Sequence, residues 1–373
     1  GAPFSVSDCQ QAGMPQPATA AGLLHGATLL VVLLCTACVG SLGLLGPSLL
    51  LVLLPFEMTR KAYRTWSSYV AMRWFELATL LLEKWAGVKV VVSGDELRRG
   101  EAAMIISNHR TRIDWMFLWC LCLRLDLLQS MKIILKESLK SFPGFGWAMQ
   151  SFLFVFLARN KTKDLEHMET IMTYLMDHEH PVSLILFPEG TDLSDDNVEK
   201  SNAYAVRKGL PKYKHVLHPK VVGWSRSVSL LRDSCNHVYD VTVAYRDHTE
   251  GERPSEMSLL SARYPKEVHI HVQRHSMASL PEAPGDLEQW CRASFKSKEK
   301  RLQTFYAAEN STLGPEIECP VSMDEVHARW RNATIFWAAA SFLSWLSLVL
   351  VVGWLWVAAA VGAWVLVTRW GGV

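Results

Sequence analysis

The sequence predicts an α/β protein, a mixed sheet flanked by helices, with hydrophobic membrane-anchoring helices at both ends. Short apolar runs alternate with helical patterns through the middle of the 373-residue chain, which is typical of an α/β sheet. Two long uncharged segments enclose this middle part. We therefore expect a division into a polar tail at 1–21, an anchor at 22–55, an interfacial helix at 56–86, a globular domain at 87–308, a linker at 309–333 and a second anchor at 334–368.

The composition narrows the class of protein. Charged residues make up 20% and hydrophobic residues 50% of the chain, a balance that favours a membrane protein with a globular part. The formal net charge of +2 offers no strongly basic surface, so nucleic acid is not expected as a partner. The 8 cysteines show no spacing of a metal site or a disulfide framework, which indicates a reduced, cytosol-facing domain.

The two apolar segments are long enough to anchor the chain in a membrane. No charged residue occurs between Asp8 and Glu57 or between Thr334 and Thr368, and a helix of about 20 apolar residues spans a bilayer. Glycines within both segments leave two forms open, a single kinked span or a tight hairpin. Positive residues follow the first anchor but are absent from 1–21, so the central region is expected in the cytosol.

The segment after the first anchor is rich in large aromatic side chains. They suggest a helix along the membrane interface, with an ordinary amphipathic core helix as the alternative. These residues are Tyr63, Trp66, Tyr69, Trp74 and Trp85.

The central region divides into strands and helices by its apolar periodicity. The expected strands are 88–92, 102–107, 133–135, 154–157, 183–187, 241–245 and 268–272. The expected helices are 113–124, 164–178, 198–208 and 287–308. The last strand alternates cleanly between apolar and polar residues and is predicted at an edge of the sheet. The polar stretch 194–200 is predicted to be a mobile loop.

The first polar motif, SNHRTRIDW from Ser107 to Trp115, follows a buried strand directly. His109 falls where that strand ends, the edge at which open α/β sheets present their ligands. Asp114 falls in the first turn of the next helix. A loop that brings the carboxylate to one imidazole nitrogen would leave the other free to accept a proton from a hydroxyl. The alternative is a hydrogen-bonded turn histidine beside a helix-capping aspartate.

Two further strands end in polar residues and favour the chemical interpretation. The strand at 183–187 leads into Pro188-Glu189-Gly190-Thr191-Asp192, and the strand at 154–157 leads into Ala158-Arg159. Three such strand ends predict one cleft. An arginine there would suit a phosphate, because its guanidinium makes paired charged hydrogen bonds.

These motifs resemble those of a known family. NHRTRID is similar to the Asn-His-x4-Asp motif of the 1-acylglycerol-3-phosphate acyltransferases, the PlsC-like glycerolipid acyltransferases. FVFLAR resembles the second motif of that family, FPEGT the third, and VLHP, ending at Pro219, stands where the fourth is expected. The resemblance covers roughly 88–245, and several longer stretches are closest to the lysocardiolipin acyltransferase branch.

The resemblance implies a reaction and roles for the motif residues. The 87–308 domain would be an acyltransferase that moves an acyl chain from acyl-CoA to a lysophospholipid hydroxyl. His109 would be the general base and Asp114 would hold its tautomer. The substrate-binding residues would be Glu189, Gly190 and Thr191 for the glycerol backbone, Arg159 for the phosphate, and Lys136 and Pro219. Acyl-CoA is a co-substrate, so no cofactor or metal is expected, and no protein partner is predictable.

The acceptor and the organelle follow less directly. We expect an anionic lysophospholipid such as lysocardiolipin or lysophosphatidylglycerol, handled in phospholipid remodelling at the cytosolic face of the endoplasmic reticulum. The cations expected around the cleft are Arg110, Arg112, Lys132, Lys136 and Arg159. Asp192 stands where many relatives carry Arg or Ser, which should disfavour a phosphomonoester acceptor. Lys132, Lys136 and Lys140 could equally form a solvated face.

Other functions remain as alternatives. One is a 1-acylglycerol-3-phosphate acyltransferase that makes phosphatidate, and another is a non-catalytic lipid-binding membrane protein of the same fold. His269, His271 and His275 could in principle bind zinc, but no cysteine or carboxylate stands at ligand spacing nearby.

Overall fold

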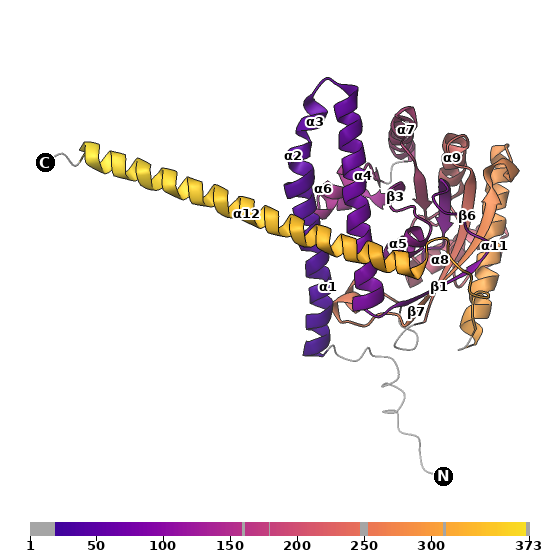
Figure 1. Cartoon of the computed structure of the whole chain (residues 1–373). Coiled ribbons are helices and arrows are strands. Elements are labelled where there is room, and N and C mark those ends of the chain that lie inside the picture. Colours follow the sequence, from indigo (N-terminus) through magenta and orange to yellow (C-terminus); the bar gives the residue numbers. More distant parts are fainter. Residues whose placement is uncertain (1–18, 159–160, 179, 247–252, 309–310, 371–373) are drawn as a thin grey trace, which may run out of the picture.

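A seven-stranded mixed sheet lies between two layers of helices, which confirms the predicted fold class (Figure 1). The structure is a computed structural model that describes residues 19–158, 161–178, 180–246, 253–308 and 311–370. The strand order is β1-β7-β6-β2-β5-β3-β4. The strands are β1 (Lys89–Gly94), β2 (Ala103–Ser107), β3 (Met131–Lys136), β4 (Val155–Leu157), β5 (Ser183–Leu186), β6 (His237–Arg246) and β7 (Glu267–Ser276).

Five neighbouring strands run in the same direction. β6, β2, β5, β3 and β4 are parallel, whereas β7 runs antiparallel to β6 and pairs in parallel with β1. The carboxyl ends of the five parallel strands therefore meet at one edge of the sheet, where ligands of such sheets bind. The predicted edge position of β7 is wrong, because β1 covers its outer side from Lys89 to Gly94. Alternation along β7 reports its two faces and not an unpaired edge.

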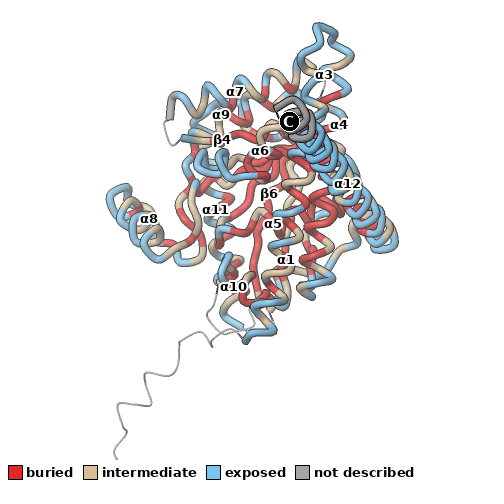
Figure 2. The backbone as a smooth tube through the Cα atoms, turned by 90° about the vertical axis from the view of Figure 1, so that its left-hand side faces the viewer, coloured by how far each residue is buried: buried red, intermediate tan, exposed pale blue. Residues whose placement is uncertain are grey.

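Helices cover both faces of the sheet. Successive residues of β2 point to opposite sides: Ile105 packs into the core under one helical layer, and Ile106 into the core under the other. The first layer contains α4 (Glu57–Leu80), α5 (Asp114–Arg124) and α6 (Phe145–Ser151), and the second contains α7 (Lys161–Asp177), α9 (Val221–Leu231) and α11 (Pro284–Ala307). Buried residues run through the centre and exposed ones lie on the outer helices (Figure 2).

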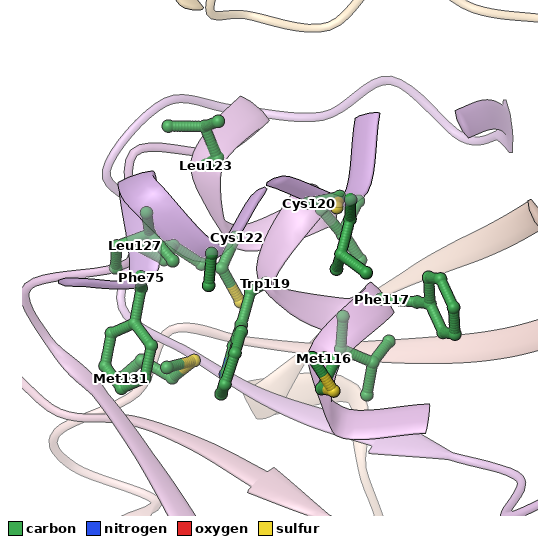
Figure 3. Close-up of a cluster of buried hydrophobic side chains, with 14 of the residues drawn as sticks. Phe75, Met116, Phe117, Trp119, Cys120, Cys122, Leu123, Leu127 and Met131 are labelled. Carbon is green, nitrogen blue, oxygen red and sulfur yellow. The ribbon is translucent and has the colours of Figure 1, made fainter. Parts of the chain in front are cut away.

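Helix α5 is buried except for the half-buried Trp115 and connects the first motif to the core. Trp119 packs against Phe75 of α4 with the rings tilted by 46° and their centroids 4.7 Å apart, and both cysteines of α5 lie in the same cluster (Figure 3). Burial raises the pKa of the Cys122 thiol to about 12. The described cysteines are all unpaired thiols.

The stretch predicted as a mobile loop is the start of helix α8 (Asp195–Lys208), so that prediction is wrong. Asp195 and Asp196 lie in the first turn, where negative charge favours the helix dipole. Gly209 ends the helix with φ +64, a left-handed conformation that suits glycine. The acidic residues that suggested a loop are the start signal of a helix.

The first apolar segment is one continuous helix from Ala20 to Leu53, not a hairpin. It consists of α1 (Ala20–Cys38), the π-helical turn η1 (Val39–Leu45), α2 (Gly46–Ser48) and α3 (Leu50–Leu53). Helix α4 then returns alongside it (Figure 1). The short helices η2 (Leu81–Trp85), η3 (Glu137–Leu139), α10 (Glu256–Leu260) and η4 (Met277–Ser279) connect other elements.

The aromatic residues of α4 divide between the core and the surface. Tyr63 and Trp74 are buried within the protein, so the interface prediction is wrong for these two and the core-helix alternative holds. Trp66 and Tyr69 line an open groove of about 560 Å³ together with Lys61.

The second apolar segment is also a single helix, α12 (Met323–Trp370), which begins inside the predicted linker. It crosses the N-terminal helix at η1, where a Cβ on Gly43 would lie 2.5 Å from Ser344 Oγ. Beyond that crossing it leaves the protein body (Figure 1), and residues 347–362 are all exposed. Ala20–Leu53 and Met323–Gly362 are long and apolar enough to cross a membrane by length and composition.

Candidate active site

Asn108 fixes the point at which the first motif leaves the sheet. Its side-chain Nδ2 donates to the Val243 carbonyl at 3.0 Å, and its Oδ1 accepts from the Val243 N–H at 2.8 Å. The side chain thus continues the pairing between β2 and β6 while the backbone turns away. The chemistry of the motif had not assigned Asn108 a role, and the structure makes it the clamp that places His109 at the sheet edge.

The structure brings His109 and Asp114 together. His109 Nδ1 lies 2.9 Å from Asp114 Oδ2, and since an ionised carboxylate only accepts, this nitrogen carries the proton. Asp114 is fully buried, whereas the His109 side chain is 17% exposed. The imidazole stacks on Phe187 with centroids 4.4 Å apart. Within the described part of the chain no residue hydrogen-bonds Nε2, the nitrogen that a substrate hydroxyl would meet.

Two further residues hold the Asp114 carboxylate. The Thr111 N–H donates to Oδ2 at 2.9 Å and its hydroxyl to Oδ1 at 3.2 Å. Tyr245, from the end of β6, donates to Oδ1 at 2.5 Å. Sequence reasoning missed Tyr245, because a tyrosine in an alternating strand is read as core; its place at the carboxyl end of a strand was the available signal.

Glu189 ties the first, third and fourth motifs to one another. Its Oε1 accepts from the His109 N–H at 2.9 Å and its Oε2 from the Leu217 N–H at 3.0 Å. The residue is 1% exposed. Burial raises the pKa of the Glu189 carboxyl well above its usual value, against the lowering effect of these two hydrogen bonds. The predicted contact of Glu189 with the glycerol backbone stays a prediction, and the observed contacts are those of a brace.

Gly190 and Thr191 form the turn that follows Glu189. Gly190 has φ +69, a left-handed conformation that suits glycine, and a Cβ there would lie 2.9 Å from Lys220 Nζ, so the lysine side chain would have to shift. The Thr191 hydroxyl accepts a hydrogen bond from Asn197 Nδ2 at 3.0 Å. Lys220 is a second residue that sequence reasoning missed, although it directly follows the fourth motif.

The other predicted substrate-binding residues differ in position. Pro219 is buried. It lies beside the third motif, since the next residue, Lys220, donates its N–H to the Pro188 carbonyl at 2.7 Å. Lys136 is exposed at the last position of β3, at the same sheet edge as the motifs. Arg159 lies outside the described residues.

The predicted cations around the site require one correction. Lys132 lies at the opposite end of β3, about 13 Å along the strand from Lys136 at about 3.3 Å per residue. It is buried, and burial followed by the charge of Arg64 lowers its pKa to about 8. It therefore belongs neither to the site nor to a solvated face. Sequence alone could not show at which end of β3 the site lies.

Two arginines of the first motif do lie beside His109. The Arg110 guanidinium lies over the Tyr306 ring, 4.2 Å from its centroid. Arg112 Nε lies 3.8 Å from Asp192 Oδ1, which joins the first and third motifs by charge. Asp192 is therefore partly neutralised by a neighbour that the sequence had placed only in another motif.

The histidines of β7 make other contacts. His269 Nε2 lies 2.9 Å from Glu267 Oε2, and His271 Nδ1 lies 3.1 Å from Ser93 Oγ. Among the described residues, no three His, Cys, Asp or Glu side chains converge to hold a metal ion.

Comparison with known proteins identifies relatives of this chain. The family model described as "Acyltransferase" matches residues 89–245, and the model "Acyltransferase C-terminus" matches 258–337. The chain is 44% identical over 284 residues to lysocardiolipin acyltransferase 1 of Danio rerio, covering 76% of this chain and 71% of that protein. It is 33% identical over 298 residues to 1-acyl-sn-glycerol-3-phosphate acyltransferase 2 of Brassica oleracea, covering 78% and 75%.

One solved structure also matches this chain. The 1-acyl-sn-glycerophosphate (LPA) acyltransferase PlsC from Thermotoga maritima matches with a TM-score of 0.43 and 18% identity, covering 76% of this chain and 98% of that one.

Proposed function

This chain belongs to the acyltransferase family, and on that premise we propose that it transfers a fatty acyl chain from acyl-CoA to the free hydroxyl of an anionic lysophospholipid. Family membership makes it a glycerolipid acyltransferase, and its two helices that are long and apolar enough to cross a membrane support an association with membranes. The observation that carries the proposed mechanism is the hydrogen bond from His109 Nδ1 to the fully buried Asp114, 2.9 Å long.

In the proposed reaction, His109 Nε2 takes the proton from the acceptor hydroxyl as the oxygen attacks the thioester carbonyl. The tetrahedral intermediate collapses, the carbon–sulfur bond breaks, and the imidazolium returns its proton to the departing CoA thiolate. Asp114 stabilises the imidazolium and fixes the tautomer. The transfer needs no metal, ATP or other cofactor.

An acyl-enzyme route through serine has little support. Gly223-Trp224-Ser225 lies inside helix α9 and not at a strand-to-helix turn, which is the geometry of a nucleophile elbow. Direct transfer between the two substrates therefore fits the arrangement better.

The charges beside His109 favour an anionic acceptor. Arg110 is a cation of the first motif, Lys220 directly follows the fourth, and Lys136 ends β3 at the same edge. We infer that the acceptor is a phosphodiester lysolipid, with lysocardiolipin or lysophosphatidylglycerol ahead of lysophosphatidate, and the names of several relatives agree with this choice. The phosphatidate-forming reaction is the second candidate, because other relatives carry that name.

A radiolabelled acyl-CoA assay of the purified protein against a panel of lysophospholipids tests the proposal. We expect turnover of lysocardiolipin and lysophosphatidylglycerol above that of lysophosphatidate. Much faster acylation of lysophosphatidate than of any lysocardiolipin species would show the second candidate to be right.

Asp192 is expected to contribute to this preference. Asp192→Arg replaces a carboxylate, 3.8 Å from Arg112, by a second guanidinium. The added positive charge should move the acceptor ratio toward the phosphomonoester lysophosphatidate, which carries more charge on its phosphate. Asp195→Arg is the matched control, because Asp195 lies in the same stretch and is 94% exposed. Equal acceptor ratios in Asp192→Arg and the control would mean that Asp192 only shapes its loop.

We further propose that the protein is an integral membrane protein of the endoplasmic reticulum, with its catalytic domain in the cytosol and α12 crossing the bilayer. Positive residues flank both apolar segments on the catalytic side, among them Arg64 and Arg329. In sealed microsomes, an impermeant thiol reagent should label Asp196→Cys on α8. The matched control, Gly372→Cys beyond α12, should react only after the vesicles are opened. The reverse pattern would overturn the orientation.

A further inference from the structure

Tyr245 links the carboxyl end of β6 to the first turn of α5. Its hydroxyl donates to Asp114 Oδ1 at 2.5 Å, and its ring meets Phe117 edge-on with centroids 5.3 Å apart. The residue is 1% exposed. Burial, followed by the charge of Asp114, raises the pKa of the Tyr245 phenol well above its usual value. The phenol therefore remains a hydrogen-bond donor throughout the pH range of enzyme assays.

The two oxygens of Asp114 have separate partners. Oδ2 accepts from His109 Nδ1 and from the Thr111 N–H, each at 2.9 Å. Oδ1 accepts from the Tyr245 hydroxyl at 2.5 Å and more weakly from the Thr111 hydroxyl at 3.2 Å. Thr111 and Asp114 belong to the same turn, so their contacts move together when that turn moves. The Tyr245 contact ties the carboxylate to the sheet.

We propose that Tyr245 is a positioning residue for acyl transfer, which holds Asp114 so that Oδ2 stays on His109 Nδ1. This inference rests on the proposed function, in which His109 is the base. The Tyr245 hydroxyl also draws negative charge from the Asp114 carboxylate, because it donates a strong hydrogen bond to one of the carboxylate oxygens. With less negative charge, the carboxylate holds the imidazolium proton of His109 less tightly. Tyr245 thus sets both the orientation and the basicity of His109 without contacting substrate.

Tyr245→Phe removes the hydroxyl and keeps the ring. We expect kcat to fall about 10–100-fold, by analogy with the loss of an outer-shell hydrogen bond behind a metal-binding histidine, with the KM of both substrates unchanged. The acid limb of the kcat/KM profile should move to higher pH, because Asp114 without its donor holds the imidazolium proton more tightly. A substitution that only loosened the core would leave this limb in place.

Tyr239→Phe is the matched control. Tyr239 lies on the same strand, is also buried, and donates its hydroxyl to a carboxylate, Glu101 Oε2, at 3.0 Å. It lies toward the other end of β6 from Tyr245, so its loss should lower thermal stability without moving the pH profile. The proposal would be overturned if Tyr245→Phe kept the wild-type kcat and the wild-type acid limb of the kcat/KM profile. It would also be overturned if the changes in Tyr245→Phe equalled those in Tyr239→Phe.

Two further measurements separate this inference from the proposed function. In an Asp114→Asn background, Tyr245→Phe should cause no additional loss, because the carboxylate that it orients is gone. 3-Fluorotyrosine at position 245, a stronger donor in an otherwise intact fold, should move the acid limb to lower pH. If 3-fluorotyrosine leaves the acid limb of the kcat/KM profile unmoved, the proposed role of Tyr245 is wrong, and this test holds even if Tyr245→Phe fails to fold. An active His109→Ala enzyme would instead contradict the proposed base itself.

Discussion

His109→Ala is expected to reduce acyl transfer by about 10²–10⁴-fold, the contribution usual for a general base. The substitution removes an imidazole that is hydrogen-bonded to a fully buried carboxylate, 2.9 Å away. It should leave the fold in place, since the lost ring stands at the edge of the sheet, stacked on Phe187, and the backbone N–H that binds Glu189 is retained. Initial rates with labelled acyl-CoA, beside a thermal unfolding curve in detergent, measure the two effects separately.

His218→Ala provides the matched control for His109→Ala. His218 lies in the fourth motif, and its Nε2 bonds the Pro211 carbonyl at 2.9 Å instead of a carboxylate. The His218→Ala enzyme should therefore keep most of the wild-type activity. Near-normal turnover by purified His109→Ala enzyme would rule out the proposed mechanism, and an equal loss in His218→Ala would show that the effect is not specific to the base.

Asp114→Asn extends the same prediction. An asparagine can present its NH₂ group to Nδ1, which then has to accept, so that Nε2 carries the proton and cannot act as the base. The loss should approach that of His109→Ala although the side chain keeps its shape. Such a loss would mean that the Asp114 carboxylate contributes to catalysis by keeping the proton on His109 Nδ1.

The strands and the first motif could be predicted because their signals are local. Each apolar run between turn residues became a strand, and the short spacing from His109 to Asp114 allows one turn to bring them together. The chemistry of those residue types then indicated a base and its partner. Nothing distant in the sequence is needed for either inference.

The remaining features depend on pairing between distant segments. Tyr245 reaches Asp114 only because β6 lies beside β2, and that register cannot be read from an alternating strand. Lys132 was placed at the site because the direction of β3 relative to the motifs was unknown. The partner of β7 was missed for the same reason, since β1 lies far away in the sequence.

Glu189 shows how tertiary contacts change the interpretation of a motif. As part of FPEGT it was predicted to bind the glycerol backbone, yet both of its oxygens accept backbone N–H groups. One of these groups belongs to His109 itself. We therefore expect Glu189 to act through the position of the base and of the fourth motif.

Glu189→Gln is expected to lower kcat about 100-fold, because displacing a catalytic group by about 1 Å can have an effect of that size. Glutamine keeps one acceptor oxygen and turns an NH₂ group toward the second N–H, so either His109 or Leu217 loses its partner. A buried N–H without a partner costs about 1–3 kcal/mol, so the free energy of unfolding should fall by a similar amount. Activity assays and thermal unfolding of the same preparation test both expectations.

Glu299→Gln is the matched control for Glu189→Gln. It distinguishes the effect of Glu189 on His109 from the effect of holding the loop of the fourth motif. Glu299 of α11 accepts from the N–H groups of Lys214, His215 and Val216, so it holds the same loop through bonds that do not involve His109. Its replacement should lower stability comparably, while kcat falls much less than in Glu189→Gln. If Glu189 instead bound the glycerol backbone, Glu189→Gln would raise the KM for the acceptor and leave the melting temperature unchanged. That result would support the role predicted from the motif, binding of the glycerol backbone, and would contradict a role of Glu189 in positioning His109.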